Sequence, residues 1–200
     1  MQYINQLEYP HLKYNHNLKN GGPPEGRDSV KTSGCGLCCA SMVVEHLTVN
    51  TLPIEECVKL SEENGANLHA GTTMEDLGPV IAERYALDFS YTKNIDDAIA
   101  NLRCGGRVIA LVGGDRDDGY VGLFAKRLHY ILLVSYDGDE FCILDPAYTD
   151  TKFTEDGRVG RTRIDPPFIY ASKEEVMLAT QAISKRYFLF SRKRPKHPVE

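Results

Sequence analysis

Residues 33–47, SGCGLCCASMVVEHL, decide the fold. Residues 35–47 are apolar around most of the circumference that a helix would present, which predicts a central, buried helix. A loop rich in glycine and proline, residues 19–34, precedes this helix. The stretch also carries three of the chain's six cysteines, so its structure and its chemistry have to be interpreted together.

Three further helices are predicted after the central one. Each begins at a residue type that favours a helix start, and acidic residues follow in the first turn. Pro79 falls early enough in the second of these helices to be tolerated, or it splits that helix. The predicted helices cover residues 53–65, 72–87 and 94–104, with starts at Pro53, Thr72 or Thr73, and Asn94.

The second half of the chain has the texture of a sheet. Short runs rich in β-branched and aromatic residues alternate with turn signals, and Asp137-Gly138 marks a hairpin. A late helix is predicted over residues 172–182. Because helices come first and an antiparallel sheet second, the fold class is α+β. The predicted strands are residues 107–112, 128–136, 140–145 and 185–193.

Length and composition indicate one soluble globular domain. The chain has 200 residues, of which 42% are hydrophobic and 26% charged, and this is enough to bury a core without metal or disulfide staples. We assign residues 1–191 to the domain and residues 192–200 to a basic, disordered tail. A formal net charge of -5 disfavours general attraction to nucleic acid or to an anionic membrane.

The first residues give no targeting signal. Residues 1–14, MQYINQLEYPHLKY, lack the basic start and apolar run of a signal peptide. No apolar segment approaches the ~18 residues that a membrane-spanning helix needs. We therefore expect a cytoplasmic protein whose thiols stay reduced.

The cysteine cluster has several possible interpretations. Cys35 and Cys38 have the C-x-x-C spacing of zinc and redox sites, but zinc needs two more ligands and a redox motif should follow a strand of a βαβ unit. No second close pair and no such strand is predicted. The structural alternative is that the cysteines are core thiols, since free cysteine is among the most buried residue types. The isolated cysteines are Cys57, Cys104 and Cys142.

Cys35 differs from the other cysteines in its position. A Gly-Cys-Gly turn leads directly into the predicted central helix, and the glycines leave room around the sulfur. A sulfur at a helix N-terminus faces unpaired N–H groups and the positive end of the helix dipole, which stabilise a thiolate. The same N–H groups can hold an oxyanion. Cys35 is therefore the candidate nucleophile.

His129 and Asp145 are the candidate base and its orienting carboxylate. A hairpin turn over residues 136–138 places them directly opposite each other, and a turn over residues 137–139 places them one diagonal step apart on the same face. A two-residue turn puts them on opposite faces unless a bulge intervenes. A triad of Cys35, His129 and Asp145 is therefore geometrically permitted.

With these residues in place, the chain resembles a known family. SGCGLCCASMVVEHL resembles the GCGPTSLAMVLNYL-type helix of bacterial papain-like cysteine peptidases, in particular the bacteriocin-processing (double-glycine leader) peptidases and their stand-alone relatives. LHYILLVSYDGDEFCILDPAY resembles the second block of that family, a GHFVVVVGYDDGKVYVNDPA-type hairpin. The intervening AGTTMEDLGPVIAERYAL and IDDAIANLRCGGRVIALV resemble its small helical region and following strand. The likeness runs in order over roughly residues 8–190.

The resemblance implies a papain-like fold with Cys35 as nucleophile, His129 as base and Asp145 as orienting carboxylate. It also implies an upstream glutamine that donates to the oxyanion. The segment that corresponds to it, YPHLKYNHN, has no glutamine. Asn15 is the nearest amide and takes that place in the expected site, because Gln2 and Gln6 come too early.

The expected function is that of a thiol hydrolase, most specifically a cysteine peptidase that acts on a peptide, a protein or another amide. No cofactor and no metal is implied. Deamidation or acyl transfer would use the same acyl-enzyme, because the fold and the triad do not determine the acceptor. The alternative from a different functional class is a binding module that has a papain-like fold and no catalytic activity.

Overall fold

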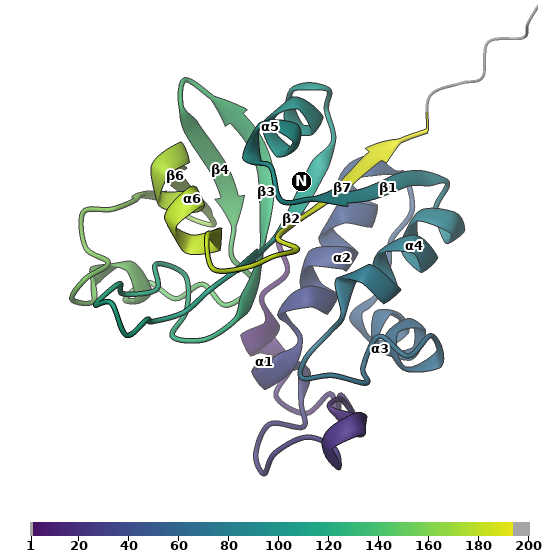
Figure 1. Ribbon diagram of the computed structural model, residues 1–200. Helices are drawn as coiled ribbons and strands as arrows, with labels where there is room; N and C mark the ends of the chain where they lie inside the picture. Colours follow the sequence, from purple (N-terminus) through teal and green to yellow (C-terminus); the bar gives the residue numbers. More distant parts are fainter. Residues whose placement is uncertain (1, 194–200) are drawn as a thin grey trace, which may run out of the picture.

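The computed structural model describes residues 2–193 (Figure 1). The helices are α1 (Val30–Ser33), α2 (Cys35–Leu47), α3 (Ile54–Glu63), α4 (Met74–Arg84), α5 (Ile95–Arg103) and α6 (Lys173–Thr180). The strands are β1 (Leu87–Thr92), β2 (Arg107–Val112), β3 (His129–Asp137), β4 (Glu140–Leu144), β5 (Arg163–Asp165), β6 (Phe168–Ser172) and β7 (Tyr187–Arg192). Short 3-10 helices are η1 (Gln6–Glu8), η2 (Leu18–Asn20) and η3 (Lys152–Thr154).

The strands form one seven-stranded sheet in the order β1-β7-β2-β3-β4-β6-β5, and every neighbouring pair is antiparallel. The α+β class is therefore confirmed. The central helix is also confirmed, with its predicted bounds and with ten of its thirteen residues buried. The sheet covers the apolar side chains on one side of α2, and α3 and α4 cover those on another side, as Figure 1 shows.

Two cores lie on the two faces of the sheet, and alternate strand residues point into them. On one face, Tyr130 and Leu132 pack with α2, α3 and α4. On the other face, Ile131 and Leu133 pack with α5 and α6. Since β3 is buried on both sides over most of its length, His129 begins a strand that is held firmly in place.

Three strands were not predicted. The helix predicted over residues 72–87 ends at Arg84. Ala86 then takes a left-handed conformation with φ 53°, and Leu87 begins β1. The edge strand β5 and its neighbour β6 also escaped prediction. At the C-terminus, Arg192 belongs to β7, where it pairs with Leu87, and not to the predicted tail. Most of that tail, residues 194–200, lies outside the described residues.

A glycine allows the start of α2 to approach β3 closely. A Cβ on Gly36 would lie 2.9 Å from Cβ of Thr72 and 3.1 Å from Cδ2 of Tyr130. Both distances are shorter than ordinary contacts, so a larger residue would force α2 away from the strand. The Gly-Cys-Gly turn therefore brings the sulfur of Cys35 up to the beginning of β3.

The β3–β4 hairpin combines a two-residue turn with a bulge. Asp137 pairs with Glu140 across the turn, but Leu133 pairs with Ile143, because the register shifts between Leu133 and Ser135. The bulge reverses the effect of the short turn on side-chain direction. His129 and Asp145 consequently return to the same face, in the diagonal relation that a turn over residues 137–139 would have given.

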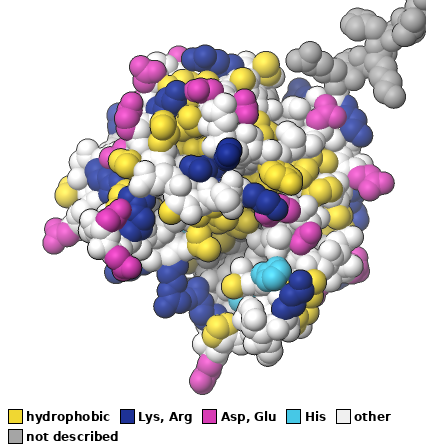
Figure 2. Space-filling view, viewed as in Figure 1, with side chains coloured by type: hydrophobic (Ala, Val, Ile, Leu, Met, Phe, Trp, Pro, Cys, Tyr) yellow, Lys and Arg dark blue, Asp and Glu magenta, His cyan; other side chains and the backbone are white. Residues whose placement is uncertain are grey.

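The surface is of mixed charge. Figure 2 shows acidic and basic side chains interspersed over the face viewed in Figure 1, with apolar side chains in small groups. No helix within residues 2–193 combines the length and the apolar character that crossing a membrane requires.

Candidate active site

Cys35 is the first residue of α2 and is partly exposed. Burial of the sulfur on its inner side would by itself raise the pKa of the thiol. Interaction with His129 and the backbone N–H groups of Tyr130 and Gly36 outweighs that effect and lowers the pKa below its ordinary value. Cys35 therefore has the surroundings of a stabilised thiolate.

His129 lies beside Cys35 at the start of β3 and is 6% exposed. Its Nε2–H donates to Oδ1 of Asp145 at 2.8 Å, so Nδ1 is the nitrogen available to the thiol. Burial would lower the pKa of the imidazole, but the charge and hydrogen bond of Asp145, with a contribution from Cys35, raise it to about 9. A lowered thiol pKa beside a raised imidazole pKa favours the thiolate–imidazolium pair.

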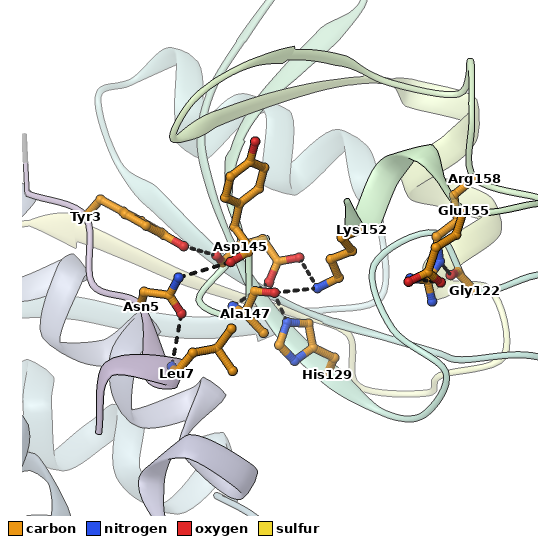
Figure 3. A network of polar contacts seen from close by, with 11 residues as sticks. Tyr3, Asn5, Leu7, Gly122, His129, Asp145, Ala147, Lys152, Glu155 and Arg158 are labelled. Atoms are coloured by element: carbon orange, nitrogen blue, oxygen red, sulfur yellow. Dashed lines mark hydrogen bonds and ion pairs between the residues drawn. The ribbon is translucent and has the colours of Figure 1, made fainter. Parts of the chain in front are cut away.

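Asp145 follows β4 and is fully buried. Its Oδ1 also accepts from the backbone N–H of Ala147 at 2.8 Å, and its Oδ2 accepts from Nζ of Lys152 at 2.5 Å. Burial would raise the pKa of the carboxyl, but the positive charges of Lys152 and His129 hold it well below its ordinary range. Figure 3 shows Asp145 between these partners, with its carboxylate reached by both His129 and Lys152.

The N-terminal segment lies against the residues that follow β4. The hydroxyl of Tyr3 donates to the backbone oxygen of Asp145 at 2.7 Å, and Nδ2 of Asn5 donates to that of Tyr148 at 3.0 Å. The next contact involves Gln6, whose N–H donates to the backbone oxygen of Pro146 at 2.7 Å. Figure 3 shows Tyr3 and Asn5 on the side of Asp145 opposite Lys152.

Gln6 also reaches the turn before the nucleophile. Its Nε2 donates to the backbone oxygen of Lys31 in α1 at 2.7 Å, and α1 is separated from Cys35 by Gly34 alone. The side chain is 6% exposed, and its Oε1 has no hydrogen-bond partner among the described residues. Gln6 therefore lies between α1, which directly precedes α2, and the segment after Asp145. A buried amide with an unused oxygen is uncommon enough to mark a special position.

Asn15 lies elsewhere. Tyr14 and His16, on either side of it, are buried, whereas Asn15 is exposed. Its backbone N–H donates to Oε1 of Glu62 and its backbone oxygen accepts from Asn67. Within residues 2–193 no hydrogen bond joins Asn15 to Cys35, to His129 or to Asp145, so the structure does not bring this predicted residue into the group.

The loop before His129 is tied to the segment after Asp145. The buried Arg158 donates from Nε to the backbone oxygen of Gly122 at 2.9 Å, and Arg161 donates from Nη1 to that of Val121 at 2.9 Å. Figure 3 shows Arg158, Glu155 and Gly122 together beyond Lys152. Leu128, directly before His129, is 66% exposed, so it does not close over the imidazole.

The remaining cysteines do not share the surroundings of Cys35. Burial raises the pKa of the thiols of Cys38, Cys39 and Cys57, as expected of core thiols. None of the six cysteines is in a disulfide, and Cys104 is exposed. Among the residues that the structure describes, no three His, Cys, Asp or Glu side chains converge as metal ligands.

Comparison with known proteins places the chain in a family. The sequence model of the Peptidase_C39 like family matches residues 2–158, a stretch that includes Gln6, Cys35, His129 and Asp145. None of the curated proteins compared with the chain matches it.

A solved structure is similar over nearly the whole chain. It is the crystal structure of a candidate C39-like peptidase from Bacillus anthracis, with a TM-score of 0.57 and 14% sequence identity. The alignment covers 98% of this chain and 96% of that one. At this identity the likeness is one of fold. The family match and the common fold together show that the chain belongs to the Peptidase_C39 like family and has the papain-like α+β fold of cysteine peptidases.

Proposed function

We propose that this protein is a cysteine peptidase that cleaves an amide bond through a Cys35–His129–Asp145 triad and an acyl-enzyme. The observation that carries the proposal is the position of the Cys35 thiol beside His129, whose imidazole donates to the buried carboxylate of Asp145 at 2.8 Å; the interaction with His129 lowers the pKa of the thiol. This arrangement is the one that activates a thiol as a nucleophile. Membership of the family supports a peptide or protein substrate.

In the acylation step, the Cys35 thiolate attacks the carbonyl carbon of the substrate and a C–S bond forms. The carbonyl oxygen takes up the negative charge. The first backbone N–H groups of α2 have no carbonyl partner within the helix, so the N–H of Cys35 is available to hold that oxygen. Collapse of the intermediate breaks the C–N bond, and the His129 imidazolium gives its Nδ1 proton to the leaving amine.

In the deacylation step, the neutral imidazole of His129 takes a proton from water, and the hydroxide attacks the thioester carbonyl. The C–S bond breaks, the carboxylic acid product leaves, and the thiolate–imidazolium pair is restored. Asp145 bonds Nε2–H throughout, which holds the imidazole with Nδ1 toward the sulfur. The triad is therefore regenerated at the end of each cycle.

Gln6, in place of Asn15, is the amide that we assign to the oxyanion. Its Nε2 donates one hydrogen to the backbone oxygen of Lys31 and has a second hydrogen to offer. Its backbone is anchored to Pro146, next to Asp145. An amide held between the two halves of the site is better placed for this role than the exposed Asn15.

The proposal is tested by digestion of a diverse synthetic peptide library, with products read by mass spectrometry. The wild-type protein is expected to cut a subset of peptides, and Cys35→Ala is expected to abolish cutting. Cys104→Ser is the matched control, because Cys104 is exposed and follows α5, an element that carries none of the proposed site residues. Retention of intact peptides without cutting would support a binding module instead. Release of ammonia from glutamine or asparagine side chains would support deamidation.

A further inference from the structure

A buried lysine bonds the side of Asp145 that His129 does not use. Lys152 is 8% exposed, and its Nζ lies 2.5 Å from Oδ2 of Asp145 and 3.2 Å from the backbone oxygen of Ala147. Burying an ammonium group is costly unless a carboxylate and further acceptors compensate it, and both are present here. Among residues 2–193, Lys152 and His129 are the side-chain cations that bond Asp145.

The fold positions Lys152 through its neighbour in η3. The buried ring of Phe153 packs edge-on against Phe124, which belongs to the loop before His129, with ring centroids 6.1 Å apart. On its other side it stacks with Tyr148 at 6.2 Å, in the segment after Asp145. Arg158 ties the same two segments together through Gly122. The ammonium group is therefore presented by an anchored turn.

The role of Lys152 follows from the charges of Cys35, His129 and Asp145. When Cys35 is a thiolate and His129 an imidazolium, these two charges cancel and the Asp145 carboxylate leaves one buried negative charge. Lys152 cancels it. The other groups that face Asp145 are neutral: the Tyr3 hydroxyl, the Ala147 N–H, and the thiol of Cys39, whose pKa burial raises.

Without Lys152, the charges of Cys35, His129 and Asp145 would sum to a net negative charge, which is unfavourable in a poorly hydrated site. Two protonation changes relieve it. Either Cys35 takes a proton and becomes a thiol, or Asp145 takes a proton and no longer favours the imidazolium. Both changes remove the reactive thiolate–imidazolium form at neutral pH.

We propose that Lys152 is a positioning residue that acts through Asp145, balancing the charge of the carboxylate so that the Cys35 thiolate and the His129 imidazolium exist together. The inference rests on the proposed function, because it concerns the protonation state of the same site. Lys152 also occupies Oδ2, which fixes the carboxylate with Oδ1 toward His129.

The test compares the pH dependence of iodoacetamide alkylation at Cys35 in the wild type and in Lys152→Met, Lys152→Gln and Lys152→Arg. Alkylation of Cys104 in the same samples is the internal control, since this exposed cysteine lies outside the group. In Lys152→Met the midpoint for Cys35 is expected to rise by about one unit, which makes alkylation about tenfold slower below the midpoint. Lys152→Arg, which keeps the charge, is expected to retain most of the wild-type profile.

Lys152→Gln separates charge from hydrogen bonding and serves if Lys152→Met does not fold. It keeps a donor of similar length without the charge, so it is expected to behave as Lys152→Met. A purely structural role would lower the folded fraction, seen by circular dichroism, without moving the Cys35 midpoint. Wild-type midpoints in both neutral variants would overturn the inference and leave the proposed function intact. An ordinary thiol profile in the wild type itself would overturn the proposed function.

Discussion

The carboxylate of Asp145 lies 2.8 Å from Nε2 of His129 because the hairpin between them contains both a two-residue turn and a bulge. Either feature alone would place the two side chains on opposite faces of the sheet. The same hairpin leads into the segment that carries Lys152 and ends near Arg158. The local irregularity of β3 thus determines which groups surround the imidazole.

Gln6 and Asn15 are expected to contribute differently to catalysis. Gln6→Ala is expected to lower kcat by about 10²-fold to 10³-fold, the usual effect of removing one oxyanion donor. Asn15→Ala is expected to change kcat less than about twofold, since Asn15 is exposed and bonded to Glu62 and Asn67 through its backbone. Steady-state kinetics on a library-derived peptide measures both. The reverse order of the two effects would return the role to Asn15.

Gly36→Ala tests the close approach of α2 to β3. The added Cβ would meet Thr72 at 2.9 Å, so the free energy of unfolding is expected to fall by about 1–3 kcal/mol and Cys35 alkylation to slow. Gly113→Ala is the matched control, because its Cβ would lie 3.5 Å from the backbone oxygen of Ala179, an ordinary contact. Urea unfolding and alkylation rates are the measurements. Equal behaviour of the two variants would show that the approach is not tight.

The pH dependence of kcat/KM is expected to reflect the deprotonation of the His129 imidazolium. His129 has to give a proton to the leaving amine, and its pKa is raised to about 9, so kcat/KM is expected to fall above about pH 9. Asp145→Asn removes the charge that chiefly raises this pKa. The alkaline limb is then expected to move toward the ordinary histidine pKa of about 6.5. An unchanged limb in Asp145→Asn would mean that a group other than His129 governs it.

The same raised pKa links His129 to stability. A group whose pKa is higher in the folded state stabilises that state below its unfolded pKa and loses this contribution as pH rises through the folded pKa. The stabilisation from His129 should therefore be complete below about pH 6.5 and decline as pH approaches about 9.

Urea unfolding of Cys35→Ala with and without His129→Gln isolates this contribution from the titration of the thiol. The difference in free energy of unfolding between the two proteins is expected to shrink from pH 6.5 to pH 9. A difference that stays constant across this window would contradict the raised pKa of His129.

The central helix could be predicted to the residue because one property of the sequence decides it. Residues 35–47 are apolar around most of the circumference, which is typical of a helix surrounded by other elements, and Gly34 and Thr48 bound it. Asn94 likewise caps α5, with its side chain accepting from Asp96. Local signals were sufficient where burial and capping agree.

Two of the unpredicted strands, β1 and β5, are defined by their partner strands more than by their own sequences. β1 pairs with β7, about a hundred residues later in the chain, and three of its six residues are exposed. β5 is three residues long and lies at the sheet edge. Neither has the strong alternation that marks a strand in isolation, and their pairing supplies the structure instead.

The residues of the site likewise divide into those that could be predicted from the sequence and those that could not. Cys35 could be singled out from its position between two glycines at a helix start, and His129 and Asp145 from the strand pattern around a hairpin. Lys152 gave no signal, because a lysine in a polar loop is ordinarily a solvated side chain. Gln6 was considered too far upstream of Cys35 in the sequence. The chain between η1 and α1 folds back so that these two elements lie in contact, and the sequence gives no sign of this.

The most direct test of the central claim is the pH dependence of iodoacetamide alkylation at each cysteine, read by peptide mass spectrometry, in the wild type and in His129→Ala. An activated Cys35–His129 pair is expected to give fast labelling of Cys35 well below pH 8, ahead of the exposed Cys104, and a marked slowing in the variant. Slow labelling of Cys35 with an ordinary thiol profile, unchanged by loss of the imidazole, would contradict an activated cysteine–histidine pair and with it the proposed peptidase.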